Sequence, residues 1–265
     1  MANQKQDMTF LEHLEVLRWH LIRSIVAIVV FSTIAFIYKD IIFDKIILAP
    51  KNSDFITNQW LCSIGNWLNI PVLCINAKPF QIINIKMAGQ FTSHINISLV
   101  AGLIIAFPYV FWEIWRFIKP AFYDNEKKHA RGAVLTSSLL FIAGVLFGYY
   151  LIVPLSVNFL GSYTISNQIL NQINLNSYIG TLTSIVLASA IAFELPIVIY
   201  FLSKLGIISS TFLKRYRKHA IIIILIVAAI ITPPDVFSQV LVSFPLYLLY
   251  EVGIVISKKI EKPAH

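Results

Sequence analysis

The stretch AIIIILIVAAIITPPDVFSQVLVSFPLYLLYEVGIVIS (residues 220–257) contains two apolar segments separated by the short interruption Thr232-Pro-Pro-Asp235. Proline cannot continue a helix but is tolerated in a first turn, so we expect one helix to end here and another to begin. We expect Thr232 to cap the second helix, with Pro233 and Pro234 in its first turn. Asp235 would then occupy the third helical position, near the free backbone donors. The stretch predicts a short helical hairpin with a tight turn.

The rest of the chain is similarly apolar. Of its 265 residues 57% are hydrophobic and 13% are charged, whereas a soluble domain has about 25% charged residues. A bilayer core needs about 20 apolar residues per helix. We therefore expect an all-α polytopic membrane protein with six transmembrane helices, at Leu21–Tyr38, Phe91–Trp112, Ala133–Val153, Ile179–Phe201, Ala220–Thr232 and Val236–Ile256.

The last two predicted spans differ from the others. The fifth has only 13 residues, and Pro245 interrupts the sixth. We expect both helices to be short, which would thin the membrane locally or leave a water-filled recess. The first span is followed by no small-residue cleavage site, so we interpret it as a retained helix.

Basic residues predict the orientation. Of the 21 lysines and arginines, sixteen fall in the two tails, at the start of the first span and in loops 113–131 and 204–219. The other five all lie in the first loop, 39–90, and the loop 154–178 has no charge. The positive-inside rule then places both termini, including the amphipathic tail 1–20, in the cytoplasm and the other two loops in the periplasm. The net charge of +8 is thus a topology signal, and we expect no nucleic-acid partner.

Cys62 and Cys74 are the two cysteines of the chain, and both lie in the first predicted periplasmic loop. An oxidising compartment would allow them to form a disulfide. The alternative is two unpaired buried thiols, and spacing alone does not decide between these. The sequence has no metal-ligand spacing, and we expect no metal and no cofactor.

Two features inside the spans predict close helix contacts or a polar cavity. Gly144 and Gly148 are four residues apart, which lets another backbone approach closely. Glu194 lies ten residues before Lys204, near the middle of the bilayer, and Pro196 deprives the preceding turn of a backbone donor. The alternative for Glu194 is a protonated side chain that is hydrogen-bonded to a neighbouring helix.

Four stretches together resemble the TatC family, the receptor subunit of the twin-arginine protein translocase. They are HLEVLR (13–18), PYVFWEIWRFIKPAFYDNEKK (108–128), FELP (193–196) and TPPDVFSQ (232–239). The resemblance covers nearly the whole chain, although the first external loop, around Gln59–Lys86, is longer than usual for the family. It implies a plasma (inner) membrane receptor that binds twin-arginine signal peptides of folded cargo, and that assembles with TatA- or TatB-type single-span proteins and with itself. Export would be driven by the proton-motive force.

The resemblance also assigns residues. Signal recognition would use Glu126, Glu15, Arg18 and Phe117, since carboxylates accept bidentate hydrogen bonds from guanidinium groups. The family tail usually has its acid at the position of Val16, so the role of Glu15 is open. Alternatively, Glu126 is a solvated acid at a helix start and Phe117 an interfacial anchor.

Further positions follow from the same match. Glu194 and Pro196 would line a concave face where partner spans dock. Pro50, Pro233, Pro234 and Asp235 would form a periplasmic hinge, in which the charge of Asp235 serves partner rearrangement rather than chemistry.

Two other functional classes fit the sequence less well. A proton-coupled small-solute transporter would suit Glu194 in a broken helix, but transporters usually show paired repeats with matching breaks, and this sequence shows none. An intramembrane enzyme is not expected, because the chain has no G-x-S-x-G, H-E-x-x-H or paired intramembrane aspartates.

Overall fold

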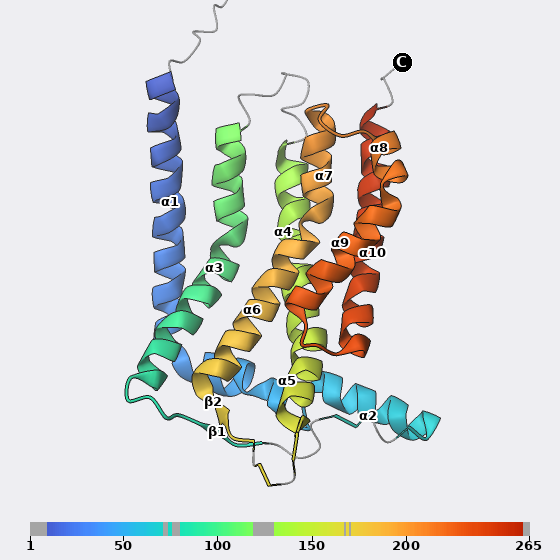
Figure 1. The fold of residues 1–265 in the computed structure, drawn as a ribbon. Coiled ribbons are helices and arrows are strands. Elements are labelled where there is room, and N and C mark those ends of the chain that lie inside the picture. Colours follow the sequence, from blue (N-terminus) through green and yellow to red (C-terminus); the bar gives the residue numbers. More distant parts are fainter. Residues whose placement is uncertain are drawn as a thin grey trace, which may run out of the picture. The chain divides into compact units, whose positions relative to one another are not determined.

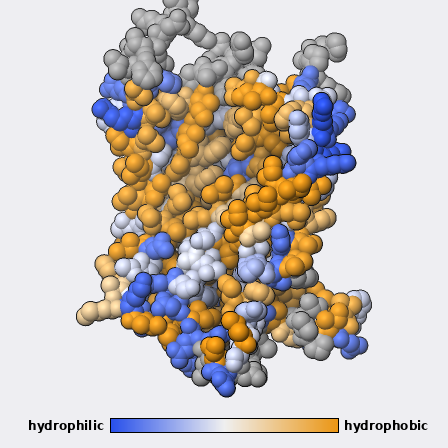
Figure 2. Space-filling view, in the orientation of Figure 1, coloured by the Kyte–Doolittle hydropathy of each residue, from blue (hydrophilic) through white to orange (hydrophobic). Residues whose placement is uncertain are grey.

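The computed structural model describes residues 10–70, 74–75, 80–118, 130–166, 168–169 and 171–261 (Figure 1). Long helices dominate these residues, and hydrophobic side chains cover most of their visible surface (Figure 2). The α-helices are α1 (Phe10–Ile37), α2 (Ile56–Leu68), α3 (Gly89–Ile118), α4 (Ala130–Phe147), α5 (Val153–Ser162), α6 (Leu175–Phe193), α7 (Leu195–Lys204), α8 (Ser210–Arg215), α9 (Arg217–Ile231) and α10 (Val236–Glu261). Shorter elements are π-helical turns at Ile41–Ile47 and Gly148–Ile152, a 3-10 turn at Ala49–Lys51, and strands β1 (Ile82–Ile83) and β2 (Ile173–Asn174).

The chain forms two compact units. Unit one combines Met1–Ile37 with Ser98–Ser138, and unit two combines Tyr38–Ile97 with Leu139–His265. Unit one thus contains α1 and most of α3, and unit two contains α2 and α5 to α10. In unit two β1 pairs in parallel with β2, in the register Ile82 to Ile173, which joins the segment before α3 to the segment before α6.

Five stretches of helix in the described part of the chain are long and apolar enough to cross a membrane: His13–Ile37, Gly89–Ile118, Gly132–Ser162, Leu175–Lys204 and Ser238–Glu261. They match five of the six predicted spans. The remaining prediction corresponds to α9, which has 15 residues and a length of about 22 Å at 1.5 Å per residue. The membrane crossing by α9 therefore stays a prediction.

The predicted short length of the sixth helix is wrong. α10 runs for 26 residues and continues through Pro245. Pro245 cannot donate to the carbonyl of Leu241, yet the loss of this one backbone hydrogen bond does not end the helix. The hairpin of α9 and α10 therefore joins one short and one long helix.

The third and fourth spans are interrupted where the chain has prolines. A π-helical turn at Gly148–Ile152 precedes Pro154, and the helix then continues to Ser162, into the segment assigned above to the second periplasmic loop. Pro154 has no N–H to donate to the carbonyl of Tyr150, and the Thr57 hydroxyl of α2 donates to that carbonyl. A side chain thus supplies a hydrogen bond that the broken helix lacks.

The close approach predicted from Gly144 and Gly148 is confirmed. A Cβ atom at Gly144 would lie 2.7 Å from the Cα of Ala190, and one at Gly148 would lie 3.1 Å from the Cα of Val186. Both neighbours belong to α6. Only glycine lets the two backbones pack at this distance, which fixes α4 against α6 in unit two.

The prediction that Thr232 caps the second helix of the hairpin is wrong. Thr232 ends α9, and its hydroxyl donates to the carbonyl of Ala228 at 2.9 Å. α10 begins at Val236, and the carboxylate of Asp235 accepts from the N–H of Ser238 at 2.8 Å. Pro233 itself precedes a proline, Pro234, and a residue before proline is driven out of helical backbone, so no helix can begin before the proline pair ends. Asp235 is therefore itself the N-cap.

This geometry gives a matched pair of variants. Asp235→Ala removes the acceptor and should cost about 1 kcal/mol, whereas Asp235→Asn keeps an acceptor and should retain most of the stability. The thermal unfolding midpoint of the detergent-solubilised protein measures both. Equal losses in the two variants would show that the negative charge, rather than the cap, stabilises the turn.

Candidate functional site

Phe117 lies in unit one, near the end of α3, in contact with two histidines of α1. Its ring stacks on that of His13, with centroids 4.6 Å apart and planes 30° apart. The ring of His20 meets it edge-on at 6.1 Å. His13 and His20 are seven residues apart and so share one face of the helix. The start of α1 and the end of α3 therefore meet at this aromatic ring. These are the two segments to which the family resemblance assigns signal recognition.

His20 is held in place by a buried carboxylate that sequence reasoning missed. Its Nδ1 atom contacts the Oε2 atom of Glu113, whose side chain is 2% exposed. The guanidinium of Arg116 lies 3.6 Å from the other carboxylate oxygen of Glu113. Both residues stand in the quoted stretch 108–128, Glu113 one turn before Phe117 and Arg116 directly before it. Helical spacing from Phe117 is the signal that would have found them.

Glu15 and Arg18 lie elsewhere on α1. They form an exposed ion pair with 3.6 Å between Arg18 Nη2 and Glu15 Oε1. Glu15 follows His13 by two residues, a rotation of about 200°, so it lies on nearly the opposite side of α1 from the face that contacts Phe117. Val16, where the family usually has its acid, is about 60° from that face. The structure therefore does not bring Glu15 to Phe117, and the acid near this ring is Glu113.

Glu126, the main predicted recognition residue, lies outside the described residues. α3, which carries Phe117, ends at Ile118, eight positions before it. A cavity of about 290 Å³ in the same unit is lined by Trp19, Ile22, Arg23, Val26, Ala27 and Tyr109. This cavity combines one guanidinium group with apolar and aromatic walls.

Glu194 occupies the break between α6 and α7 in unit two. Its amide donates to the carbonyl of Ile191 at 3.0 Å, and its own carbonyl accepts from Ile197 and Val198. Pro196, two residues later in the first turn of α7, is buried, while the Glu194 side chain is half-buried. The carboxylate thus sits where the backbone leaves regular helical bonding, as the sequence predicted.

α10 holds the segments that follow this break. The hydroxyl of Ser203 donates to that of Ser257 at 2.9 Å, and Arg217 donates to Glu251 at 2.7 Å. The carboxylate of Glu261 accepts from the backbone and the hydroxyl of Ser210. These contacts attach α7, α8 and α9 to α10. Hydrogen bonds and an ion pair therefore hold together the end of unit two that carries the basic residues of these helices.

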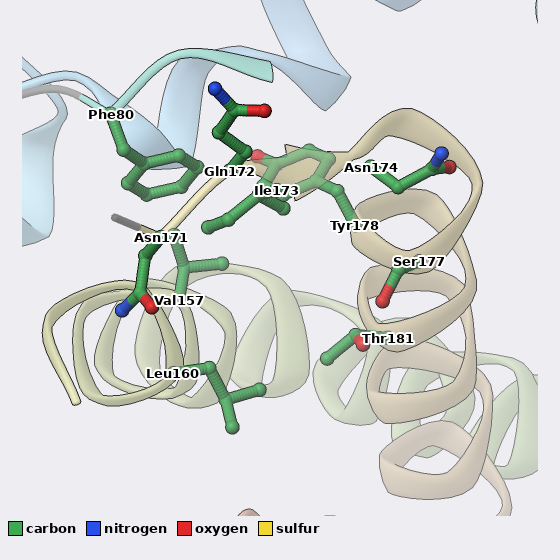
Figure 3. A pocket seen from close by; sticks show the side chains of 10 residues that line it. All are labelled: Phe80, Val157, Leu160, Asn171, Gln172, Ile173, Asn174, Ser177, Tyr178 and Thr181. Atoms are coloured by element: carbon green, nitrogen blue, oxygen red, sulfur yellow. The ribbon is translucent and has the colours of Figure 1, made fainter. Parts of the chain in front are cut away.

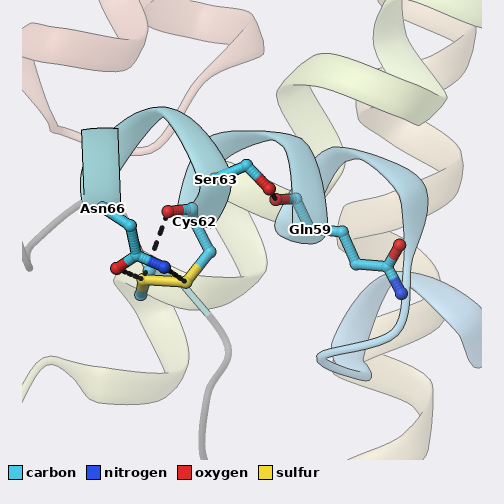
Figure 4. Close-up of a disulfide and its surroundings, with 5 residues drawn as sticks. Gln59, Cys62, Ser63 and Asn66 are labelled. Atoms are coloured by element: carbon cyan, nitrogen blue, oxygen red, sulfur yellow. Dashed lines mark hydrogen bonds between the residues drawn. A yellow bond between two sulfur atoms is a disulfide. The ribbon is translucent and has the colours of Figure 1, made fainter. Parts of the chain in front are cut away.

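The opposite end of unit two contains Pro50 and the cysteines. Pro50 is buried, and Cys62 and Cys74 form a disulfide (Figure 4). A cavity of about 510 Å³ lies beside β1 and β2. The residues that line it are polar or apolar and carry no charge (Figure 3). Tyr178 at its edge donates to the carbonyl of Ile47 at 2.7 Å. In the described part of the chain, no three His, Cys, Asp or Glu side chains gather to hold a metal ion.

Comparison with known proteins gives a consistent result. Residues 12–245 match the family model "Sec-independent protein translocase protein (TatC)". The chain is 40% identical over 264 residues to the Sec-independent protein translocase protein TatC of Blattabacterium sp. subsp. Periplaneta americana (strain BPLAN), with 99% of each chain covered. It is 35% identical over 252 residues to that of Aquifex aeolicus, with 95% of each covered. A crystal structure of the twin-arginine translocase receptor TatC matches with a TM-score of 0.70 at 34% identity, over 95% of this chain and 100% of that one.

The contact between His20 and Glu113 predicts strong coupling. Glu113→Ala leaves His20 without its buried partner and should destabilise unit one by about 3 kcal/mol, and combining it with His20→Ala should cost much less than the sum. A double-mutant cycle on thermal unfolding measures this. Glu15→Ala, in an exposed pair on the same helix, is the control and should change stability by less than 1 kcal/mol. Additive effects of the two substitutions would disprove the coupling.

Proposed function

This chain belongs to the TatC family of Sec-independent protein translocase proteins, and we propose that within the translocase it binds the twin-arginine signal peptides of folded cargo. The family membership makes it a translocase component, and its apolar helices fit a multi-pass membrane protein. The observation that carries the proposal is the meeting of α1 and α3 at Phe117. It joins the two segments that the resemblance assigns to signal recognition.

Glu126 is the principal acceptor in this proposal. A guanidinium pair needs carboxylates with free oxygens, and Glu15 already has the guanidinium of Arg18 at 3.6 Å. An incoming arginine would therefore compete with Arg18 at Glu15, although such an exposed pair is worth at most about 1 kcal/mol. Glu126 lies eight positions after the end of α3, the helix that carries Phe117. Phe117, half-buried between two histidines, then supplies an apolar surface for the signal.

Glu194 and Pro196 serve the single-span partners in this proposal. A half-buried carboxylate at a helix break offers a polar group where a partner span of the TatA or TatB type can dock. Exposed isoleucines of α9 surround one side of unit two with apolar surface, of which Ile222, Ile223 and Ile230 are the most exposed. Docking at this surface, self-association within the translocase and export driven by the proton-motive force belong to the same proposal.

Orientation follows from the charges. α7, α8 and α10 each carry lysine or arginine in the last turn, at Lys204, Lys214, Arg215, Lys258 and Lys259. The positive-inside rule supports a cytoplasmic location for this end of unit two and for both termini, in the plasma (inner) membrane. Pro50, Pro233, Pro234 and Asp235 then lie at the periplasmic side, where they would act as a hinge.

Export in cells tests the proposal. Expressed with its own single-span partners in a bacterium that lacks its twin-arginine receptor, the chain should restore export of a folded reporter. Glu126→Gln should insert normally but lose crosslinking to the signal peptide, because an amide cannot accept two guanidinium hydrogen bonds as a carboxylate does. Glu15→Gln is the matched control and should reduce crosslinking much less.

Two outcomes would contradict this assignment. Unchanged crosslinking in Glu126→Gln would remove Glu126 from the recognition site. Failure of the wild-type chain to export the reporter, with its partners present and inserted, would favour the small-solute transporter over the receptor.

Glu194 should affect assembly and not recognition. We expect Glu194→Ala to crosslink signal peptide as wild type does but to co-purify less of the single-span partners, because the partner span loses a polar contact inside the membrane. Crosslinking and co-purification on the same preparation provide the measurement and its internal control. Normal recovery of the partners would make Glu194 a structural residue of the helix break.

A further inference from the structure

Helix α2 presents an unusual apolar side to its surroundings. The helix contains no charged residue. Ile56, Trp60, Ile64, Trp67 and Leu68 recur at helical spacing and are all exposed, Trp60 by 72% and Trp67 by 81%. Two tryptophans and three aliphatic side chains thus form one continuous surface, which we call the α2 stripe. It covers the part of the first loop where the chain is longer than usual for its family.

One edge of the exposed surface of α2, next to the stripe, is polar. Gln59, Ser63 and Asn66 are exposed there, and Figure 4 shows them along one edge of the helix. The disulfide attaches Cys74 to the same edge, where its sulfur lies 3.9 Å from the side-chain oxygen of Asn66. The helix therefore has one face suited to water and another suited to an apolar medium.

The direction of α2 is fixed at its first turn by contacts within unit two. The ring of Phe55 stacks on that of Tyr150 with centroids 5.6 Å apart. Thr57 donates to the carbonyl of Tyr150, and the buried amide of Asn58 donates to the carbonyls of Pro50 and Asn52. As a result α2 runs crosswise to α5 and α10 and projects from their end (Figure 1). When these helices cross a bilayer, α2 lies parallel to its plane.

We propose that α2 is an interfacial helix that inserts the α2 stripe into the lipid bilayer at this end of the spans. Tryptophan is enriched at the membrane interface because its ring is apolar and its N–H is polar. An amphipathic helix that lies in the plane of the membrane buries its apolar face at the boundary of headgroups and acyl chains. Figure 2 shows hydrophobic atoms on the projecting end of this helix. The occupant is lipid, since α2 lies at the end of α5 and α10 (Figure 1), where a bilayer that these helices cross would have its surface.

The absence of charge from α2 determines the kind of attachment. Interfacial helices commonly add lysine and arginine, which attract anionic lipids. α2 has neither, so burial of its apolar side chains supplies the attachment. Its insertion depth should therefore not depend on the charge of the lipid headgroups.

Site-directed spin labelling of the full chain in vesicles tests the proposal. Ile64→Cys places a maleimide nitroxide on the stripe, and Gln59→Cys, five residues away, places it on the polar edge. Labelling without reductant leaves the Cys62–Cys74 disulfide intact. We expect the label at 64 to collide several-fold more with oxygen than with a water-soluble nickel chelate, and the label at 59 to show the reverse. The contrast should be the same with and without phosphatidylglycerol.

The other outcomes overturn the proposal. Equal access of the chelate to both labels would show that α2 stands in water. Protection of the label at 64 from both oxygen and chelate would show that a protein, a second copy or a partner, covers the stripe. A contrast that appears only with anionic lipid would contradict attachment by apolar burial. If Ile64→Cys does not yield folded protein, Trp67→Cys provides the same measurement at the most exposed position of the stripe.

Discussion

A backbone polar group inside a bilayer has no water to bind, and this constraint shapes the described spans of this protein. Each proline within a helix removes one donor, and at two of them the chain supplies another group or leaves regular helical geometry. Both solutions occur in unit two. At Tyr150 a hydroxyl from α2 donates to the carbonyl that Pro154 cannot reach, and at Glu194 the helix stops and restarts before Pro196. The helix breaks are therefore sites where other segments attach.

These breaks explain how unit two is held together. The bond from Thr57 to Tyr150 connects α2 to the third span, and Gly144 and Gly148 bring that span against α6. α6 ends at Glu194, and α7 continues along α10. A carboxylate placed at such a break is costly in lipid, and in our proposal a partner span packs against it. The same interruption that weakens the helix thus creates the proposed docking position.

Sequence reasoning predicted the features that depend on local chemistry. Apolar length located five spans, the prolines located the break at Glu194, and the glycine pair located a close helix contact. It failed where the outcome depends on neighbouring residues or on the partner helix. A residue before proline is disfavoured in helical backbone, so the helix starts after the proline pair and its N-cap is Asp235 instead of the predicted Thr232. Glu113 was missed because its importance comes from His20, 93 positions earlier in the chain. α2 was missed because a short uncharged segment within a loop carries no transmembrane signal.

Glu113 also changes how the recognition surface should be understood. A family acid at the Val16 position would sit near the face of α1 that contacts Phe117, whereas Glu15 points away from that face and is paired with Arg18. In this chain a buried carboxylate on α3 holds His20, and His20 in turn contacts Phe117. A buried carboxylate that already has a histidine and an arginine nearby is poorly placed to bind two further guanidinium groups. Its contribution is to fix α1 against α3, and our proposal assigns the arginines of the signal to other carboxylates, of which Glu126 is the principal one.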